Sequence, residues 1–410
     1  MTDARTLQAD VIVVGGGPAG LSAATELRRL GVTSVAVLER EPTAGGIPRH
    51  CGHYPFGARE FKRVMKGPDY ARRLVVAATG AGVSIHTGVT VTSIEPGPCL
   101  RLATPNGLTE ARAKLVLLAT GVRETSRAAR LLGGTKPAGV MTTGTLQSMV
   151  YLERLRPFKR PVILGTELVS FSAIMTCRHL GIRPAAMIEP GLRTTARWPS
   201  GLFPALLGVP LHLGTELMSI NGRDVVGSVT VTDPAGSREI ECDGVIVSGR
   251  FRPDRAVLHG SHLGTDSATG GPEVDQYGRC SDPAFFAAGN MLRAVETAGW
   301  SWNEGRLIAR TMTQALEGSL PEATTSRITL SGDALAYCVP QRLAASAPAM
   351  PLPGVQLRVN RAVKGKLVLR VNAEDQTPKS IDARPERRII LPYPDLPQDA
   401  QVEIRLEEST

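Results

Sequence analysis

Long apolar segments are missing from this chain of 410 residues. No run approaches the roughly 18 consecutive apolar residues of a membrane-spanning helix. The first apolar strand begins after about ten mainly polar residues, which leaves no room for a signal peptide. We therefore expect a soluble, cytoplasmic protein. With 42% hydrophobic residues, the chain is long enough to bury a large core in two or three domains.

Blocks of like charge are also absent. The formal net charge is +9, but it is spread along the chain as single residues, and aromatic residues make up only 4%. Because nucleic-acid-binding proteins concentrate their basic residues, nucleic acid is not an expected partner. An anionic cofactor, an anionic substrate or an acidic partner surface each fits the basic balance.

Closely spaced cysteine pairs are missing too. The absence of C-x-x-C and C-x-C spacings argues against an iron–sulfur cluster held within the chain, a redox disulfide between close neighbours and an extracellular disulfide framework. No metal site is expected, because the neighbouring histidines and cysteine of residues 50–53 cannot all converge on one zinc ion. The six cysteines are Cys51, Cys99, Cys177, Cys242, Cys280 and Cys338.

A glycine-rich turn follows the first apolar strand, in the sequence GGGPAG. Gly15 permits a tight turn, Gly17 lets the backbone approach a pyrophosphate, and Gly20 lets the following helix lie close to the sheet. The helix N-terminus then faces the phosphates. Glu39, 24 residues after Gly15, is placed to bind an adenosine ribose. Its charge would repel a 2′-phosphate, so the pattern predicts FAD or NAD rather than NADP.

The same pattern occurs a second time at an offset of 150 residues, where residues 11–39 align without a gap with residues 161–189. We infer two nested mononucleotide-binding-like domains. In the second copy Glu167 replaces Gly17 and Ser170 replaces Gly20. A carboxylate at this position would repel a pyrophosphate, so we expect NAD binding to be lost or weakened. The alternative is a rearranged nicotinamide site that Glu189 still anchors through a ribose.

Two further apolar strands end in small residues, at Ala119-Thr-Gly and at Ala287-Ala-Gly-Asn. Small residues let a chain pass close to a flat ligand or a phosphate. A helix is predicted to begin near Ala298 and to place its N-terminus toward the same ligand.

These features together resemble the two-dinucleotide-domain flavoproteins of the glutathione reductase type, over about residues 9–320. Residues 44–53, 67–71 and 137–147 are similar to one branch of that family. The branch contains the flavoprotein associated with anaerobic glycerol-3-phosphate dehydrogenase and, more distantly, the pyridine-nucleotide-type subunits of opine oxidase and hydrogen cyanide synthase.

The resemblance implies non-covalent FAD, with NAD binding in doubt. It places the turn on the pyrophosphate, Glu39 on the adenosine ribose, and Gly289 with Asn290 near the ribityl chain. Many relatives have aspartate where Asn290 stands, and disulfide reductases have a cysteine pair where this chain has only Cys51. The residues expected to bind FAD are Gly15, Gly17, Pro18, Ala19, Gly20, Glu39, Arg40, Gly46, Val91, Ala119, Thr120, Gly121, Gly289 and Asn290.

Candidate catalytic residues lie in two short segments that the resemblance places near the flavin. His50 or His53 could act as a base, since imidazole titrates near neutral pH, and Arg49 could hold an anionic group. The alternative is that the histidines bond backbone carbonyls and Arg49 holds a phosphate. Trp300 is expected to wall the flavin, to contact a partner subunit or to pack in the core.

The expected fold class is α/β, with two nested Rossmann-like (doubly wound) domains and a small C-terminal antiparallel β domain. The boundaries are 1–130 with 265–325 for the FAD domain, 131–264 for the degenerate nucleotide-binding-like domain and 326–410 for the β domain. Residues 356–371 predict two strands around a turn at Gly365.

The leading functional hypothesis is an FAD-dependent oxidoreductase that forms one subunit of a larger dehydrogenase. The resemblance implies a partner flavoprotein of the amino-acid-oxidase type and a small 2Fe-2S protein. The expected substrate is a small amine, amino acid or polyol phosphate, oxidised either in this chain or on the partner. Two alternatives remain open at this point: a stand-alone NADH-dependent flavin reductase, and a non-catalytic flavin-bound scaffold subunit.

Overall fold

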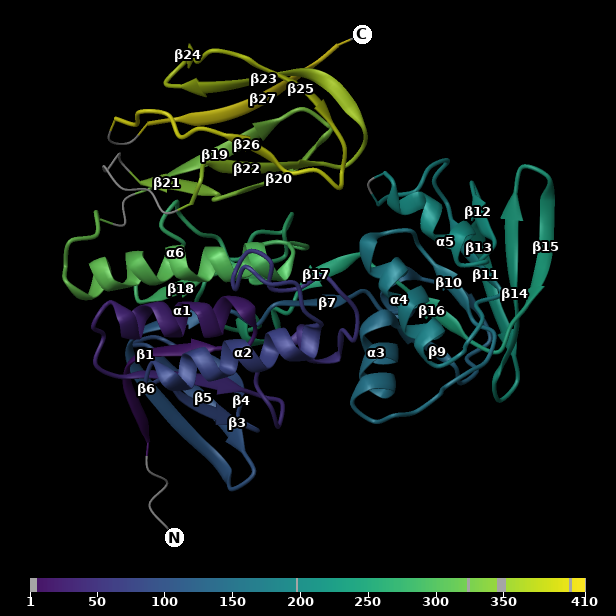
Figure 1. Cartoon of the computed structure of the whole chain (residues 1–410). Coiled ribbons are helices and arrows are strands. Elements are labelled where there is room, and N and C mark those ends of the chain that lie inside the picture. Colours follow the sequence, from purple (N-terminus) through teal and green to yellow (C-terminus); the bar gives the residue numbers. More distant parts are fainter. Residues whose placement is uncertain (1–5, 197, 323–324, 345–351, 398–399, 410) are drawn as a thin grey trace. The chain divides into compact units, whose positions relative to one another are not determined.

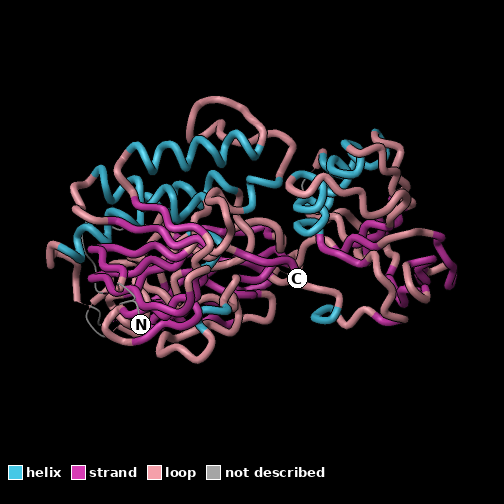
Figure 2. Tube along the Cα trace, turned by 90° about the horizontal axis from the view of Figure 1, so that it is seen from below, coloured by secondary structure: helices cyan, strands magenta, loops and turns pink. Residues whose placement is uncertain are grey.

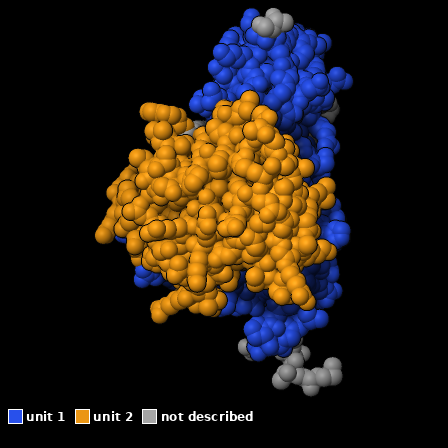
Figure 3. Space-filling view, turned by 90° about the vertical axis from the view of Figure 1, so that its right-hand side faces the viewer, with its two compact units in different colours: residues 1–46, 71–122, 252–410 blue, residues 47–70, 123–251 orange. Residues whose placement is uncertain are grey.

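The chain folds into two compact units (Figure 3). Unit 1 comprises residues 1–46, 71–122 and 252–410, and unit 2 comprises residues 47–70 and 123–251. Unit 2 is thus inserted into unit 1 as two segments. The chain passes between the units after residues 46 and 70, and again within β7 (Val122–Glu124) and β17 (Phe251–Pro253). The three-domain boundaries expected above stay a prediction. This computed structural model describes residues 6–196, 198–322, 325–344, 352–397 and 400–409, and the remaining residues of the expected domains lie outside these ranges.

Unit 1 is built on a seven-stranded sheet (Figure 1). Its central strands pair in parallel, and the two strands that follow β6 at one edge are antiparallel. In spatial order the strands are β3 (Ser84–Thr87), β2 (Val35–Glu39), β1 (Leu7–Val14), β6 (Gly107–Leu118), β5 (Cys99–Thr104) and β4 (Thr90–Glu95), with β18 (Phe285–Ala287) also paired to β6.

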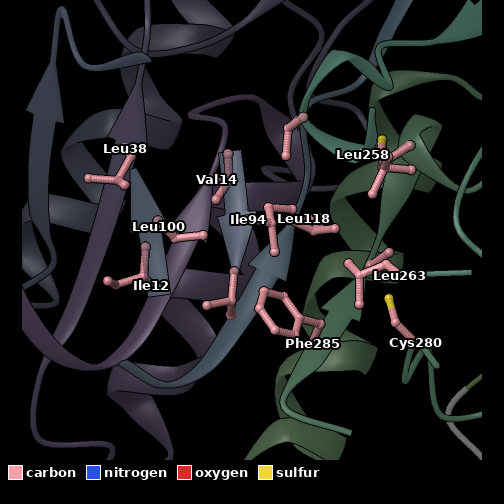
Figure 4. Packing of buried hydrophobic residues seen from close by; sticks show 14 of the residues in the cluster. Ile12, Val14, Leu38, Ile94, Leu100, Leu118, Leu258, Leu263, Cys280 and Phe285 are labelled. Atoms are coloured by element: carbon pink, nitrogen blue, oxygen red, sulfur yellow. The ribbon is translucent and has the colours of Figure 1, made fainter. Parts of the chain in front are cut away.

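The central strands are buried on both faces, as parallel strands covered by other layers usually are. Residues 11–14, 35–39 and 115–118 are all buried, and the apolar runs at these positions therefore form strands. Figure 4 shows Ile12, Val14, Leu118 and Phe285 directed into one apolar cluster.

Three helices belong to this unit, α1 (Pro18–Arg29), α2 (Gly67–Gly80) and α6 (Ala298–Leu316), although the first four residues of α2 fall in unit 2. Helix α1 packs along α6, and Figure 2 shows long helices running beside the strands. Short 3₁₀ turns occur at η4 (Ala256–Leu258) and η5 (Gly289–Met291). Within the described ranges, no helix is long and apolar enough to cross a membrane.

Unit 2 contains a parallel five-stranded sheet and a smaller sheet that share one apolar cluster. The parallel sheet, in spatial order, is β12 (Leu211–Leu213), β11 (Ala186–Glu189), β10 (Val162–Leu164), β16 (Val245–Val247) and β9 (Val140–Thr142). The smaller sheet is β15 (Gly236–Glu241), β14 (Val226–Asp233), β13 (Glu216–Gly222) and β8 (Gly133–Gly134). The helical segments are η1 (Ile47–His50), η2 (Ala128–Arg130), α3 (Thr143–Tyr151), α4 (Leu168–His179), η3 (Ser200–Leu202) and α5 (Phe203–Leu206).

The sequence repeat corresponds to a repeat of structure. The Gly15 N–H donates to the Leu38 carbonyl at 2.9 Å, and 150 residues later the Gly165 N–H donates to the Ile188 carbonyl at 2.9 Å. The two glycines have φ of 110° and 106°, a region that only glycine enters readily. The β1–α1–β2 and β10–α4–β11 segments are therefore two copies of one βαβ unit, as the sequence predicts.

The C-terminal residues of unit 1 form a β-sandwich whose two sheets share an apolar core. The larger sheet is β21 (Arg342–Ala344), β19 (Thr325–Ser331), β27 (Val402–Glu408), β23 (Val363–Val371) and β24 (Glu374–Asp375), with β25 (Lys379–Ala383) also on β23. The smaller sheet is β20 (Leu335–Val339), β22 (Val355–Val359) and β26 (Ile389–Leu391). All strand pairs are antiparallel except β19 with β27.

The prediction of a turn at Gly365 is wrong. Gly365 lies inside β23, and β22 and β23 belong to different sheets. A Cβ atom on Gly365 would lie 2.2 Å from the Glu407 carbonyl oxygen. The glycine is therefore required for close approach of β27 rather than for a turn.

Phe285 is fully buried in the sheet core of unit 1. We expect Phe285→Ala to lower the free energy of unfolding by about 3–5 kcal/mol, because the cavity is not refilled. Chemical denaturation followed by circular dichroism measures the change. Val76→Ala, at a residue 68% exposed on α2, is the control and should change stability little. Equal effects of the two substitutions would contradict the assigned core.

Candidate functional site

The first glycine turn is held by contacts that leave no room for side chains. A Cβ on Gly15 would lie 2.4 Å from the Ala119 carbonyl oxygen, and a Cβ on Gly20 would lie 1.9 Å from the Gly15 carbonyl oxygen. Helix α1 therefore begins directly against the turn. Gly17 is its N-cap, and Pro18 occupies the first helical position, where the missing N–H costs nothing.

In front of Gly17 the space is open. The nearest atom to a Cβ placed there is the Gly46 Cα at 3.9 Å, and Gly46 itself approaches the turn with φ of 63°. An unpaired helix N-terminus beside such a space is a site where phosphate binds. The cradle thus fits the pyrophosphate of a dinucleotide.

Glu39 lies at the end of β2 with a side chain fixed by backbone donors. Its Oε2 accepts a hydrogen bond from the Gly16 N–H at 2.9 Å and its Oε1 from the Glu41 N–H at 2.9 Å. Each carboxylate oxygen retains a lone pair for a ribose hydroxyl. The neighbouring Arg40 bonds Asp254 at 2.8 Å.

The strand ends expected to line the cofactor site come close to this turn. Ala119 contacts Gly15, as described above, and the Thr120 hydroxyl donates to the Asp254 carbonyl at 2.8 Å. A Cβ on Gly289 would lie 2.7 Å from the Cβ of Ala19, so η5 touches the start of α1.

Two other residues expected to bind FAD, Asn290 and Val91, make contacts away from the glycine turn. Both amide atoms of Asn290 bond the backbone of Glu296, at 2.6 and 3.1 Å, and close the loop before α6. Val91 lies in β4 and packs against the apolar core. Two residues before it, the Val89 N–H donates to the Glu39 carbonyl at 2.9 Å, and the role of Val91 in binding FAD stays a prediction.

The turn at Gly165 has the same backbone arrangement as the first turn but carries different side chains. Glu167 is the N-cap of α4, and its Oε1 accepts a hydrogen bond from the Arg250 N–H at 2.7 Å. A Cβ on Gly249 would lie 2.3 Å from the Glu167 carboxyl group, so this side chain covers the end of β16. Burial raises the pKa of Glu167, an effect that the Arg250 N–H and Arg130 oppose.

Ser170 stands where Gly20 stands in the first copy. It is fully buried, and its hydroxyl donates to the Ser248 hydroxyl at 2.9 Å. Glu189 accepts a hydrogen bond from the Gly191 N–H at 3.0 Å and one from the Thr166 hydroxyl, in parallel with Glu39.

The predicted catalytic residues of the first segment lie in unit 2. Arg49 and His50 are in η1, and His53 Nδ1 lies 2.9 Å from the Tyr54 carbonyl oxygen. The histidine ring also contacts Phe56, with ring centroids 5.6 Å apart. A bond between a histidine ring and a backbone carbonyl is what the non-catalytic alternative predicts. The catalytic roles of Arg49, His50 and His53 stay predictions.

Cys51 is a free, buried thiol. Its sulfur approaches the Ile47 carbonyl at 3.4 Å and the Gln147 side chain at 3.6 Å. Burial raises the pKa of Cys51 to about 12, and nearby Glu124 adds to the effect. All six cysteines of the chain lie among the described residues, and all are free and buried.

Trp300 belongs to unit 1, at the start of α6, where the guanidinium of Arg388 lies 4.2 Å from its ring centroid. The sequence reasoning missed this arginine and the buried charges around it. A local signal was lacking, because Arg388 lies 88 positions away in the β-sandwich. In the described part of the chain, no group of three acidic, histidine or cysteine side chains could hold a metal ion.

A turn that fits a pyrophosphate, a carboxylate with free lone pairs beside it and a repeated βαβ unit are the features of a dinucleotide-binding flavoprotein. The chain belongs to the pyridine nucleotide-disulphide oxidoreductase family, which matches residues 9–305. Its cofactor is FAD, whose two-electron redox chemistry defines the protein as an oxidoreductase.

Sequence identity to individual members of known function is low. The chain is 26% identical to hydrogen cyanide synthase subunit HcnB of Pseudomonas aeruginosa over 321 residues, 70% of this chain and 68% of that protein. It is 27% identical to dihydrolipoyl dehydrogenase of the same organism over 344 residues, 74% and 71% of the two chains. Among solved structures, thioredoxin reductase of T. acidophilum aligns with a TM-score of 0.64 at 23% identity, covering 76% of this chain and 99% of that one.

We expect Gly20→Ala to abolish FAD binding, because the added methyl group would lie 1.9 Å from the Gly15 carbonyl oxygen. The absorbance ratio of flavin to protein after purification measures the loss. Gly80→Ala at the end of α2 adds a methyl group with nothing within 4 Å and should retain FAD. Retention of FAD by Gly20→Ala would exclude this turn as the cofactor site.

The buried thiols should not react in the native state. Burial raises the pKa of Cys51, Cys177 and Cys338 to about 12 and that of Cys242 to about 11. Below those values the thiols stay protonated, and thiolate is the reactive form. With 5,5′-dithiobis(2-nitrobenzoate) at pH 8 we expect no rapid reaction of native protein and six equivalents in denaturant. A rapidly reacting native thiol would reopen disulfide chemistry.

Proposed function

We propose that this FAD-dependent oxidoreductase is one subunit of a multi-subunit dehydrogenase. In this proposal it passes electrons between a small substrate and a partner that holds a flavin or an iron–sulfur cluster. The substrate class is a small amine, amino acid or polyol phosphate, and the site of action is the cytoplasm. The observation that carries the proposal is the position of Glu167 over the end of β16.

Glu167 opposes the use of NAD as the electron source. A pyrophosphate at the start of α4 would meet a carboxylate where Gly17 leaves open space in the first copy. Two unit charges about 4 Å apart repel each other by about 4 kcal/mol at an effective dielectric constant near 20. Protonation of Glu167 would remove this repulsion but would still leave its side chain over Gly249.

The second electron route of this family is a redox disulfide, and the residues around Cys51 do not provide one. It requires two cysteines within bonding distance, of which one must reach the thiolate state. Cys51 has no cysteine neighbour in its segment, and burial keeps its thiol protonated. With both routes opposed, a partner protein is the remaining electron exchanger.

Two further observations support a partner. The relative at 26% identity is named as a subunit, of hydrogen cyanide synthase. In addition, unit 2 contains 20 Lys and Arg against 12 Asp and Glu, a formal charge of +8, whereas unit 1 contains 27 against 26. The basic excess therefore does not accompany the FAD turn. It suits an acidic partner, which a small 2Fe-2S protein beside an amino-acid-oxidase-type flavoprotein could supply.

Within this proposal, Arg49 and the histidines of the same segment handle substrate. Arg49 would hold an anionic group of the substrate, and His50 or His53 would accept a proton as hydride leaves. Trp300, which already stacks on Arg388, would stand beside the cofactor.

Anaerobic stopped-flow mixing with NADH tests the proposal. We expect no fast bleaching of the flavin in the wild-type protein, whereas dithionite still reduces it. Glu167→Gln, which removes the charge and keeps the shape, should accelerate reduction by NADH on the order of tenfold or more. Fast bleaching of the wild-type protein would instead establish the stand-alone reductase.

Glu216→Gln provides the matched control. It removes one exposed carboxylate from β13 of the same unit, and it should leave the rate with NADH unchanged. A rate increase equal to that of Glu167→Gln would reflect the net charge of unit 2 rather than the turn. Isolation of the native protein as a fully active monomer would contradict the subunit proposal.

A further inference from the structure

Five charged side chains are buried together where the β-sandwich meets the start of α6. None is more than 12% exposed. They come from the loop before α6, from α6 itself and from the smaller sheet of the sandwich. They are Arg293, Glu296, Glu304, Arg358 and Arg388.

One side of this cluster reaches the FAD turn. Arg293 donates to Glu304 Oε1 at 2.8 Å, and the other oxygen of Glu304 accepts the Gly289 N–H at 2.8 Å. Gly289 in turn lies against Ala19 at the start of α1. The Gly289 N–H therefore joins the charged cluster to η5, which lies against the start of α1.

The other side belongs to the sandwich. Arg358 donates to Glu296 Oε1 at 3.1 Å, and Arg388 lies 3.5 Å from the same oxygen while stacking on Trp300. The Tyr337 hydroxyl donates to the Ala294 carbonyl at 3.0 Å. The loop of residues 290–296, which Asn290 closes, is thus held by side chains from β20, β22 and the segment before β26.

The charges in the cluster do not balance. Three guanidinium groups face two carboxylates, so one positive charge is in excess. Because these groups are buried, salt screens them only weakly. Loss of either sandwich arginine would leave Glu296 with fewer donors and would release the loop beside Gly289.

We propose that the β-sandwich is part of the FAD site, with Arg358 and Arg388 as positioning residues that hold residues 289–297 against the first turn. This inference requires FAD binding, which family membership supplies, and is independent of the proposed partner. It assigns the C-terminal domain a role in cofactor affinity.

Arg358→Met and Arg388→Met test the proposal, since methionine keeps the apolar stem and removes the charge. FAD is titrated into the full-length apo-protein, and flavin fluorescence gives the dissociation constant. We expect both variants to bind FAD about tenfold more weakly, a typical size for indirect coupling. Arg388→Lys, which retains a cation over Trp300, should recover most of the affinity.

Arg370→Met is the matched control. Arg370 pairs with Asp375 in the larger sheet, and its loss should leave the dissociation constant within about twofold of the wild-type value, as for an exposed ion pair. Hydrogen exchange separates positioning from general destabilisation. In Arg388→Met the amides of residues 289–297 should lose protection more than those of β23 and β27.

Unchanged FAD affinity in both arginine variants would overturn the proposal, as would an equal loss of protection throughout the sandwich. If neither variant folds, Trp300→Leu removes the stack and keeps every charge. It should weaken FAD binding in the same direction by a smaller factor, and unchanged affinity in this variant would also overturn the proposal.

Discussion

The close approach of helices α1 and α6 to the first glycine turn is the constraint on which the rest of unit 1 depends. Gly20 brings α1 against the Gly15 carbonyl, and a Cβ on Gly305 would lie 2.2 Å from the Ala19 carbonyl oxygen. Because backbone meets backbone at both points, these helices have a fixed position. This contact also positions the features around it. They are the cofactor cradle, η5 and the loop that contacts the sandwich.

Comparison of the two βαβ copies shows which part of the motif serves the fold and which serves the ligand. The second copy retains the tight turn at Gly165 and the carboxylate at the end of its second strand. It replaces the close approach by buried hydroxyl bonds, in which Thr143 and Ser170 both donate to the Ser248 hydroxyl at 2.9 Å. The fold therefore survives without the glycines that a pyrophosphate requires.

The sequence predicted these units because their signals are local. A strand, a turn, a helix and a second strand fall within 30 residues, and each needs particular residue types. The FAD cradle was predictable on the same basis. The strand pairing of the sandwich was not predictable, because an alternation of apolar and polar residues indicates a strand but does not say which strands pair. Gly365 looked like a turn residue, although its partner strand lies about 40 residues further on.

The buried charges at α6 could not be found in the sequence for a related reason. A buried arginine is stable only when its partners are assembled in space, and the partners of Glu296, one in β22 and one just before β26, lie 62 and 92 positions further on. Such groups look like ordinary surface residues until the fold is known. Together these ion pairs lie between the sandwich and the segment before α6, both within unit 1. Val339 of β20 lies in the apolar core of the FAD sheet, and the ion pairs extend that contact to the loop beside the turn.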